Sequence, residues 1–473
     1  MRKGGLRFAG FDAQTVIGSA KRASTAHTQS MIIIAIRRCA AQSARTQPAT
    51  GPAAGGRKTP SMASVVGRPF NASRHRWDNM RENRAFATLI CFLVGCWCVR
   101  PRPWWQWAAI VTAFVLLQRR MVRGTFCRSA RDLSGKLVVI TGASSGIGAH
   151  TAITLATRHN ATVVGSCRSQ DVDEEKRKLV KLASGYGGEK AQAAVERLVT
   201  LYPLELTSWA SIDDFCRKVR YYHLGTATET PEASQQDATR RGGIFALVNN
   251  AGAIQHTFKQ TDQQEEYMTV ANFVGPVRLT ETLLPCLEPA AAEAVDDPAA
   301  VVAPTPSGRI INVTSGSHLT LTDPNVGALL PCPSGTAVTQ VFNFMNRYVL
   351  SKLCNIYHAD YLAEKGYLAV SVNPGGVASG IFRSAMPNLS GWYPLLTCLV
   401  LKTSHEGAQT LVHCVTADDL VPGGLYTECK LRLHAKSPVA CNSTSRQSAM
   451  VWAFEKMGHV KPLSLPEGPV KPK

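Results

Sequence analysis

The sequence predicts a doubly wound α/β fold, in which helices cover both faces of a parallel β-sheet. From Leu133 onwards, short apolar runs typical of buried strands alternate with helical stretches. The first run leads directly into a glycine-rich turn, and a helical stretch follows that turn. The chain has 473 residues, of which 45% are hydrophobic, so it is long enough to bury a sizeable core.

Six apolar runs are expected to form the strands of this sheet. Each is four or five residues long, as buried strands of a parallel sheet often are. They are residues 137–140, 162–165, 199–202, 244–248, 310–313 and 369–372. Two polar segments, near residues 225–243 and 288–308, interrupt the alternation. We expect both to be surface insertions, because they contain too few apolar residues to fold alone.

The basic charge of the chain is confined to its N-terminal part. Residues 1–131 contain 22 Lys and Arg against 3 Asp and Glu, which accounts for the whole formal charge of +19. Residues 132–473 contain 30 residues of each sign and are neutral. A neutral folded body lacks the basic face that binding to a phosphate backbone requires, so we expect no nucleic-acid binding.

Residues 1–84 are rich in Ala, Ser, Thr, Arg and Gly and contain almost no acidic residues. This composition is typical of a disordered segment or of a mitochondrial targeting segment. A third interpretation is that translation starts at Met80 and that the preceding residues are an artefact of the gene model. The sequence leaves the three interpretations open.

Two apolar runs, residues 85–99 and 104–117, precede the predicted sheet. Each is shorter than the roughly 20 residues that a spanning helix needs, and neither has a polar face for packing on a globular body. Three tryptophans at the start of the second run are typical of a bilayer interface, and arginines flank both ends. We therefore expect residues 85–128 to be a membrane anchor, either a shallow hairpin or one irregular span.

The first predicted strand ends in Thr141-Gly-Ala-Ser-Ser-Gly-Ile-Gly148, ahead of a helical stretch at 149–157. Glycines allow the backbone to turn sharply and to approach a pyrophosphate, while the first N–H groups of the helix can bind the anion. We expect a dinucleotide to bind here through Gly142, Ser144, Ser145, Gly146, Ile147 and Gly148.

Further motifs follow this turn in a fixed order. They are Asn249-Asn-Ala-Gly252, Asn272, Ser315, Tyr348-Val-Leu-Ser-Lys352 and Pro374-Gly375. With the pattern Thr-Gly-x-x-x-Gly-x-Gly, they make the sequence resemble the short-chain dehydrogenase/reductase family over about residues 133–460. The resemblance implies a Rossmann-type domain, which we place at residues 129–460, that transfers a hydride between a nicotinamide cofactor and an alcohol or carbonyl.

The resemblance also implies roles for individual residues. The catalytic residues would be Asn272, which holds a water in the family's proton relay, Ser315, Tyr348 and Lys352. In addition to the glycine turn, the cofactor would contact Arg168, Asn249, Ala251, Gly252, Tyr348, Lys352, Pro374, Gly375, Val377 and Ser379. No metal site is expected.

The chemistry of hydride transfer independently supports Tyr348 as a general acid/base. Hydride addition to a carbonyl leaves negative charge on oxygen, so a proton donor is needed there. Lys352 lies one helical turn from Tyr348, and its charge, together with the oxidised nicotinamide, would lower the pKa of the phenol. Ser315 would orient the substrate oxygen, although the spacing leaves Thr314 and Ser317 as alternatives.

Arg168 follows the second predicted strand, where a basic side chain can pair with the 2′-phosphate of NADP. NADP(H) is therefore favoured as the cofactor. NAD(H) remains open, because Asp171 and Asp173 follow shortly afterwards and an acidic residue can accept the ribose hydroxyls of NAD.

Several segments resemble the retinol dehydrogenase branch of the family. They are Cys167-Arg168, Arg309-Ile-Ile-Asn-Val313, His405-Glu-Gly-Ala-Gln-Thr410 and Gly424-Leu-Tyr-Thr-Glu-Cys-Lys430. With the apolar stretch at 381–402, this resemblance indicates a lipophilic substrate such as a retinoid, a sterol or a lipid aldehyde. A membrane-bound cofactor-binding scaffold without turnover is the alternative, and it would be marked by a missing catalytic residue.

These expectations together predict the protein's partners and location. The partners would be a lipophilic small molecule and membrane lipid, and a homodimer remains open. We expect the protein at the endoplasmic reticulum or the lipid-droplet surface with its catalytic domain facing the cytosol, and a mitochondrial location is the alternative. Residues 461–473 are expected to be a tail.

Overall fold

The computed structural model describes residues 103–224, 243–288, 308–331, 343–381, 399–432 and 434–458, together with Thr88 and Phe92. All of these belong to one compact unit, Pro60–Lys473. A second unit, Met1–Thr59, lies outside the described residues, as do the predicted tail and most of both predicted insertions. The expectations for those segments stay predictions.

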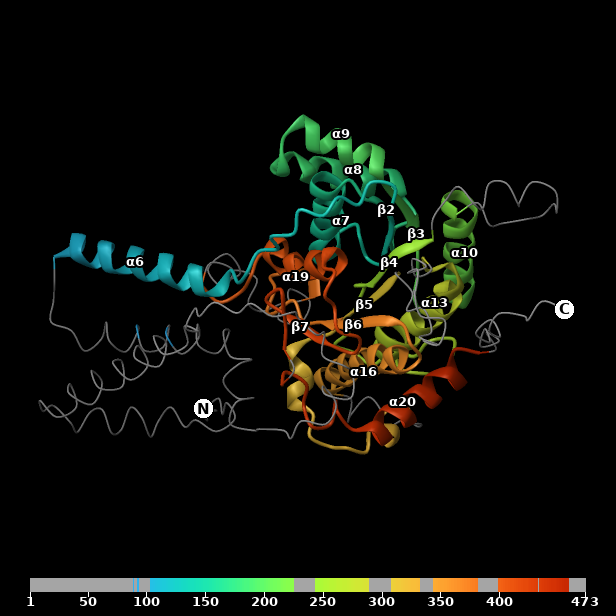
Figure 1. The fold of residues 1–473 in the computed structure, drawn as a ribbon. Helices are drawn as coiled ribbons and strands as arrows, with labels where there is room; N and C mark the ends of the chain where they lie inside the picture. The colour runs from blue at the N-terminus through green and yellow to red at the C-terminus, as the bar shows by residue number, and fades with distance from the viewer. Residues whose placement is uncertain are drawn as a thin grey trace, which may run out of the picture. The chain divides into compact units, whose positions relative to one another are not determined.

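A central eight-stranded sheet organises the described part of the chain (Figure 1), in the order β3-β2-β1-β4-β5-β6-β7-β8. Strands β1 to β7 are parallel, and β8 pairs antiparallel with β7. The strands are β1 (Leu137–Ile140), β2 (Thr162–Cys167), β3 (Val199–Pro203), β4 (Ile244–Asn249), β5 (Arg309–Val313), β6 (Leu368–Val372), β7 (Leu425–Thr427) and β8 (Lys430–Leu431). The predicted α/β fold and its six predicted strands are confirmed.

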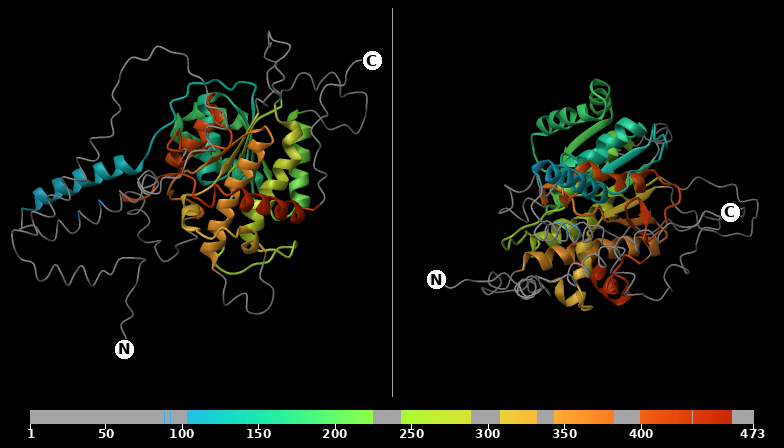
Figure 2. Two further views of the ribbon diagram at one scale, coloured as in Figure 1. Left: turned by 60° about the horizontal axis from the view of Figure 1, so that its bottom comes forward. Right: turned by 90° about the vertical axis from the view of Figure 1, so that its left-hand side faces the viewer.

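Alternate residues of the strands face two separate hydrophobic clusters, as the two-residue period of a strand requires. On β1, Val138 and Ile140 belong to one cluster, while Leu137 and Val139 belong to the other. The first cluster includes residues of α7 (Gly146–His159), α8 (Val172–Ala183), α9 (Glu189–Leu198) and α19 (Ser404–Thr416). Helices therefore cover the sheet on both faces (Figure 2).

The opposite face carries a second layer of helices. It consists of α10 (Trp209–Val219), α13 (Gly275–Leu283) and α16 (Phe344–Glu364), with α20 (Ser443–Lys456) packed on α16. Short helical turns complete the described elements: η1 (Ser184–Tyr186), η2 (Arg220–Leu224), α12 (Tyr267–Thr269), η3 (Val270–Val274), η4 (Leu284–Cys286), η5 (Gly316–Thr320) and α14 (Val326–Leu329).

Helix α6 (Trp104–Val122) precedes the sheet and exposes much of its apolar surface. Trp104 is 82% exposed and Leu116 is 67% exposed, whereas Gln118 and Val122 near the end of the helix are buried. Among the residues that the structure describes, no helix is both long enough and apolar enough to cross a membrane.

Candidate active site

A cavity of about 590 Å³ lies at the carboxyl ends of the central strands, where ligands bind in doubly wound sheets. Most of the predicted site residues line it. They are Gly142, Ser144, Ser145, Gly146, Ile147, Arg168, Ala251, Gly252, Ser315, Tyr348, Lys352, Pro374, Gly375, Val377 and Ser379. Gly148, Asn249 and Asn272 are not among the lining residues.

The glycine turn is shaped for close approach of a ligand to the backbone. Gly142 and Gly146 have φ angles of 67° and 56°, in the left-handed region that glycine adopts without strain. A Cβ on Gly148 would lie 2.2 Å from the Gly142 carbonyl oxygen, so this glycine keeps the turn closed rather than touching a ligand. Helix α7 starts after Ser145, whose side chain makes no capping hydrogen bond. The turn therefore fits a cofactor pyrophosphate.

The last residue of β4, Asn249, and the next residue, Asn250, point to opposite sides of the sheet. Asn250 lines the cavity, and its amide donates to Thr141 O at 2.9 Å. Asn249, which we expected to contact the cofactor, instead donates to Asn312 Oδ1 (2.8 Å) and Thr280 Oγ1 (2.9 Å). Its side chain points away from the cavity because successive residues of a strand face opposite sides, so Asn249 ties β4 to β5 and α13.

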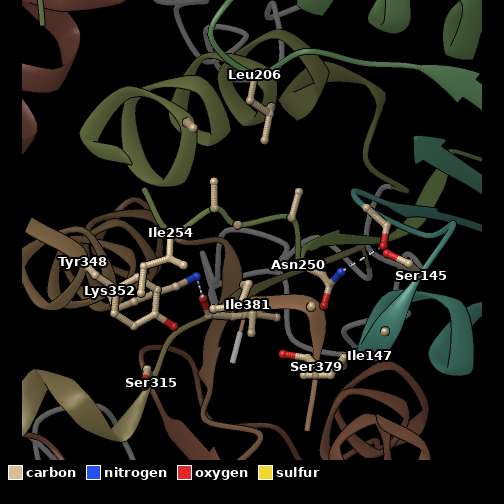
Figure 3. A pocket seen from close by; sticks show the side chains of 18 of the residues that line it. Ser145, Ile147, Leu206, Asn250, Ile254, Ser315, Tyr348, Lys352, Ser379 and Ile381 are labelled. Atoms are coloured by element: carbon tan, nitrogen blue, oxygen red, sulfur yellow. Dashed lines mark hydrogen bonds between the residues drawn. The ribbon is translucent and has the colours of Figure 1, made fainter. Parts of the chain in front are cut away.

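Tyr348, Ser315 and Lys352 meet at one end of the cavity (Figure 3). The Tyr348 hydroxyl lies near the Ser315 side chain, and the Lys352 ammonium lies 5.9 Å from the centre of the Tyr348 ring. Both Tyr348 and Lys352 come from α16, one turn apart, while Ser315 follows β5. The arrangement places a proton donor, a hydroxyl partner and a cation together.

Ser315 lowers the pKa of the Tyr348 hydroxyl, whereas Thr314 and Ser317 are not among the groups that shift it. Thr314 also lines the cavity, but its side chain is buried and its hydroxyl donates to Lys352 O at 2.6 Å. Ser317 contributes its backbone N–H to Ser315 Oγ at 3.2 Å. Ser315 is therefore the hydroxyl that faces Tyr348.

Burial governs the protonation of the two residues on α16. Burial lowers the pKa of Lys352 to about 8, while its ammonium donates to Val313 O at 3.2 Å. Burial raises the pKa of Tyr348, and Ser315 opposes this effect. Lys352 is not among the groups that shift this pKa in the protein alone, and its predicted effect together with an oxidised nicotinamide stays a prediction. In the protein alone the phenol is thus held protonated, as a proton donor should be.

Asn272 lies in η3 and is fixed by three hydrogen bonds. Its Oδ1 accepts from Ala253 N at 2.7 Å, and its Nδ2 donates to Ala253 O at 2.9 Å and to Ser351 Oγ at 3.1 Å. It therefore joins the loop after β4 to α16, next to the catalytic pair. Its predicted role in holding a water stays a prediction.

Tyr267 is a site residue that the sequence analysis missed. It lines the same cavity as Arg168 and lies close enough for the Arg168 guanidinium to influence its pKa. Burial raises its pKa, whereas the charge of Arg168 lowers it. The sequence carries no signal for this proximity, because Tyr267 and Arg168 are about 100 residues apart and no motif surrounds Tyr267.

Comparisons with known proteins agree with this geometry. A family model described as short chain dehydrogenase matches residues 136–321. Human retinol dehydrogenase 11 is 28% identical over 317 residues, which cover 66% of this chain and 83% of that protein. Human dehydrogenase/reductase SDR family member 13 is also 28% identical, over 357 residues that cover 73% of this chain and 79% of that protein.

Among solved structures, the angucycline C-6 ketoreductase LanV with bound NADP has a TM-score of 0.43 and 18% sequence identity. The match covers 64% of this chain and 97% of that one. The family model and the sequence relatives define the class: this chain belongs to the short-chain dehydrogenase family. It is an NAD(P)-dependent oxidoreductase whose sequence is retinol dehydrogenase-like at modest identity.

The pKa of Lys352 predicts how the rate depends on pH. The ammonium is charged below a pH of about 8 and loses its proton above it, so any step that needs its charge fails at alkaline pH. We expect kcat/KM for the reduced cofactor, which reports on the free enzyme, to fall about tenfold per pH unit above that value. A profile that stays flat to pH 10 would show that the charge of Lys352 is not required.

Proposed function

We propose that this chain is an NADP(H)-dependent oxidoreductase acting on a lipophilic alcohol or carbonyl compound, such as a retinoid, a sterol or a lipid aldehyde. The observation that carries the proposal is one cavity with two chemically distinct ends. At one end lie Tyr348, Ser315 and Lys352, and at the other lie the glycine turn and Arg168.

The side chains of the site support proton transfer to a carbonyl oxygen. A bound nicotinamide cofactor would supply the hydride to the carbonyl carbon. Tyr348 would donate its proton to the oxygen, which becomes the alcohol, and Ser315 would hold that oxygen in line. The Lys352 ammonium would stabilise the phenolate that remains until Tyr348 regains a proton from solvent. In alcohol oxidation the same groups act in reverse.

The surroundings of Arg168 favour NADP(H) over NAD(H). Arg168 is exposed on the cavity wall near Tyr267, so its guanidinium is available to a 2′-phosphate. Asp171, one of the two acidic residues that kept NAD(H) open, accepts from Glu174 N at 3.0 Å as the cap of α8. Neither Asp171 nor Asp173 is among the residues lining the cavity.

Apolar side chains support a lipophilic substrate. Ile254, Met345 and Ile381 line the same cavity as the catalytic residues. The names of the retinol dehydrogenases among the relatives point to substrates of this kind. Most of the apolar stretch at 381–402, namely residues 382–398, lies outside the described residues.

We also propose that α6 belongs to a membrane-embedded hairpin. Thr88 Oγ1 donates to Gln118 Oε1 at 2.8 Å, and the rings of Phe92 and Phe114 stack at 3.9 Å. Because Thr88 pairs with the later residue of α6 and Phe92 with the earlier one, the contacts match antiparallel packing. The exposed apolar side chains of α6 fit lipid better than water. A cytosol-facing enzyme at the endoplasmic reticulum or lipid droplet is the favoured location, and the mitochondrion is the alternative.

The proposed reaction is tested by adding lipophilic aldehydes to the full-length enzyme with NADPH. We expect consumption of NADPH by the wild type and a loss of about 10²–10⁴-fold in Tyr348→Phe, because only the proton-donating hydroxyl is removed. Binding of NADPH to the variant, measured by fluorescence, serves as the control and should be nearly unchanged. A wild type that binds NADPH but turns over no substrate in the panel would favour the scaffold alternative.

Arg168→Ala tests the cofactor preference. A charge-assisted contact with the 2′-phosphate contributes roughly 1.5–3 kcal/mol, so we expect NADPH to bind at least about tenfold more weakly while NADH binding hardly changes. Arg177→Ala is a matched control, since Arg177 is an exposed arginine on α8 that does not line the cavity. Equal losses for both cofactors in Arg168→Ala would contradict the assignment.

Washing membranes with 1 M salt tests the proposed anchor. Hydrophobic insertion resists salt, whereas adsorption through basic residues is screened within a Debye length of about 3 Å. We expect the full-length protein to stay with the membrane, and Leu116→Glu with Leu117→Glu to release part of it, because both side chains are exposed. Release of the wild type by salt would mean that surface charge alone holds it.

A further inference from the structure

The end of α6 and the residues after it pack against the catalytic body, although the catalytic domain was expected to begin at residue 129. Gln118 Nε2 donates to Leu399 O at 3.0 Å, and Arg119 Nη1 donates to Leu401 O at 3.1 Å. Cys127 is buried in the core beneath the sheet. We refer to residues 118–127 as the strap.

Arg119 also reaches the start of α19. Its Nη2 pairs with the Glu406 carboxylate at 2.5 Å. Glu406 in turn accepts from Thr403 N at 2.9 Å in a capping box that fixes the first turn of α19. The strap therefore holds both ends of the short segment that contains Lys402.

A second contact of the strap reaches Lys402 through Glu428. Thr125 N donates to Glu428 Oε2 at 2.7 Å, and Glu428 forms an ion pair with Lys402. The two charged side chains are only 9% and 5% exposed, so the pair is almost fully desolvated. The Lys402 ammonium also donates to Pro374 O at 3.2 Å.

Lys402 contacts the cavity wall through its backbone as well. Its N–H donates to Gly376 O, and its carbonyl accepts from Ala378 N, both at 2.8 Å. These bonds bracket Val377, which lines the cavity. With the contact to Pro374, one residue thus holds three points of the segment 374–379, which follows β6 and borders the proposed cofactor site.

The turn that presents Glu428 is conformationally unusual. Glu428 and Cys429, between β7 and β8, have φ angles of 56° and 54° without being glycine. A two-residue turn between antiparallel strands favours positive φ angles at both of its residues, so the tight connection of β7 to β8 sets this conformation. Cys429 N donates to Thr410 Oγ1 at 3.3 Å, which joins this turn to α19. The segments 405–410 and 424–430, which take no part in the proposed chemistry, therefore contact each other here.

We propose that Lys402 and Glu428 are positioning residues for the cofactor, through which the strap holds segment 374–379 in its binding geometry. Lys402 acts on the segment directly, and Glu428 fixes the Lys402 ammonium to the strap. The inference rests on the proposed use of this cavity for a nicotinamide cofactor.

The test separates cofactor affinity from stability in the full-length protein in detergent micelles. Glu428→Gln leaves a buried lysine without its counter-charge, so we expect a lower Tm and about tenfold weaker NADPH binding. Lys402→Met combined with Glu428→Gln removes both charges, so Tm should recover. Affinity should stay about tenfold low, because methionine cannot donate to Pro374 O. If affinity recovers along with Tm, the pair is merely structural and the proposal is overturned.

Asp360→Asn is the matched control. Asp360 forms a comparably buried ion pair with Lys436, and neither residue lines the cavity. We expect this variant to lower Tm and to leave the Kd of NADPH within about twofold, because the contacts of segment 374–379 are kept. An affinity loss equal to that of Glu428→Gln would show that any buried ion pair has the same effect and would overturn the proposal.

Arg119→Gln tests the strap without changing the buried ion pair. The Arg119 side chain is 26% exposed, so the variant should fold. We expect about threefold weaker NADPH binding with little change in kcat, since the strap loses its contact with Glu406. Wild-type affinity in this variant would contradict the role of the strap. Failure of the wild type to bind NADPH would instead contradict the proposed function itself.

Discussion

Parallel pairing of β1, β4, β5 and β6 is the constraint on which the site depends. Because these strands run in one direction, their carboxyl ends lie at one edge of the sheet, and the loops that follow them all reach the same cavity. The glycine turn follows β1, Ala251 and Gly252 follow β4, Ser315 follows β5 and the segment 374–379 follows β6. Helix α16 then brings Tyr348 and Lys352 to this edge. The site therefore forms because these separate motifs lie at the same edge of the sheet.

The sequence predicted these elements well because their signal is local. The six predicted strands are short and mostly apolar, with β1 buried at all four positions, and the glycine turn needs glycine for steric reasons. Strands β7 and β8 escaped prediction because they have only three and two residues. The roles of Tyr267 and Glu428 depend on contacts between segments far apart in the chain, for which a single sequence carries no signal. Asn249 shows the remaining limit: its motif was found, but which of two neighbouring asparagines faces the cavity depends on strand register.

Two buried lysines illustrate how one residue type serves different ends. Lys352 and Lys402 are 3% and 4% exposed, and each donates to a backbone carbonyl. Lys352 lies beside a phenol and has no carboxylate partner in the contacts described. Burial therefore lowers its pKa to about 8 and makes its charge sensitive to pH. Lys402 has Glu428 as a counter-charge, which suits a fixed structural contact. The first can take part in proton transfer, while the second holds the segment on which the cofactor would rest.

The central claim is that Tyr348 protonates a carbonyl oxygen while a hydride arrives from a nicotinamide in the same cavity. Transfer of deuterium from NADPH labelled at the reactive face of C4 tests this most directly, with the alcohol product analysed by mass spectrometry. The account predicts one deuterium on the carbinol carbon of the product from the wild type, and no labelled product from Tyr348→Phe. Product alcohol formed without deuterium from NADPH labelled on either face would contradict it.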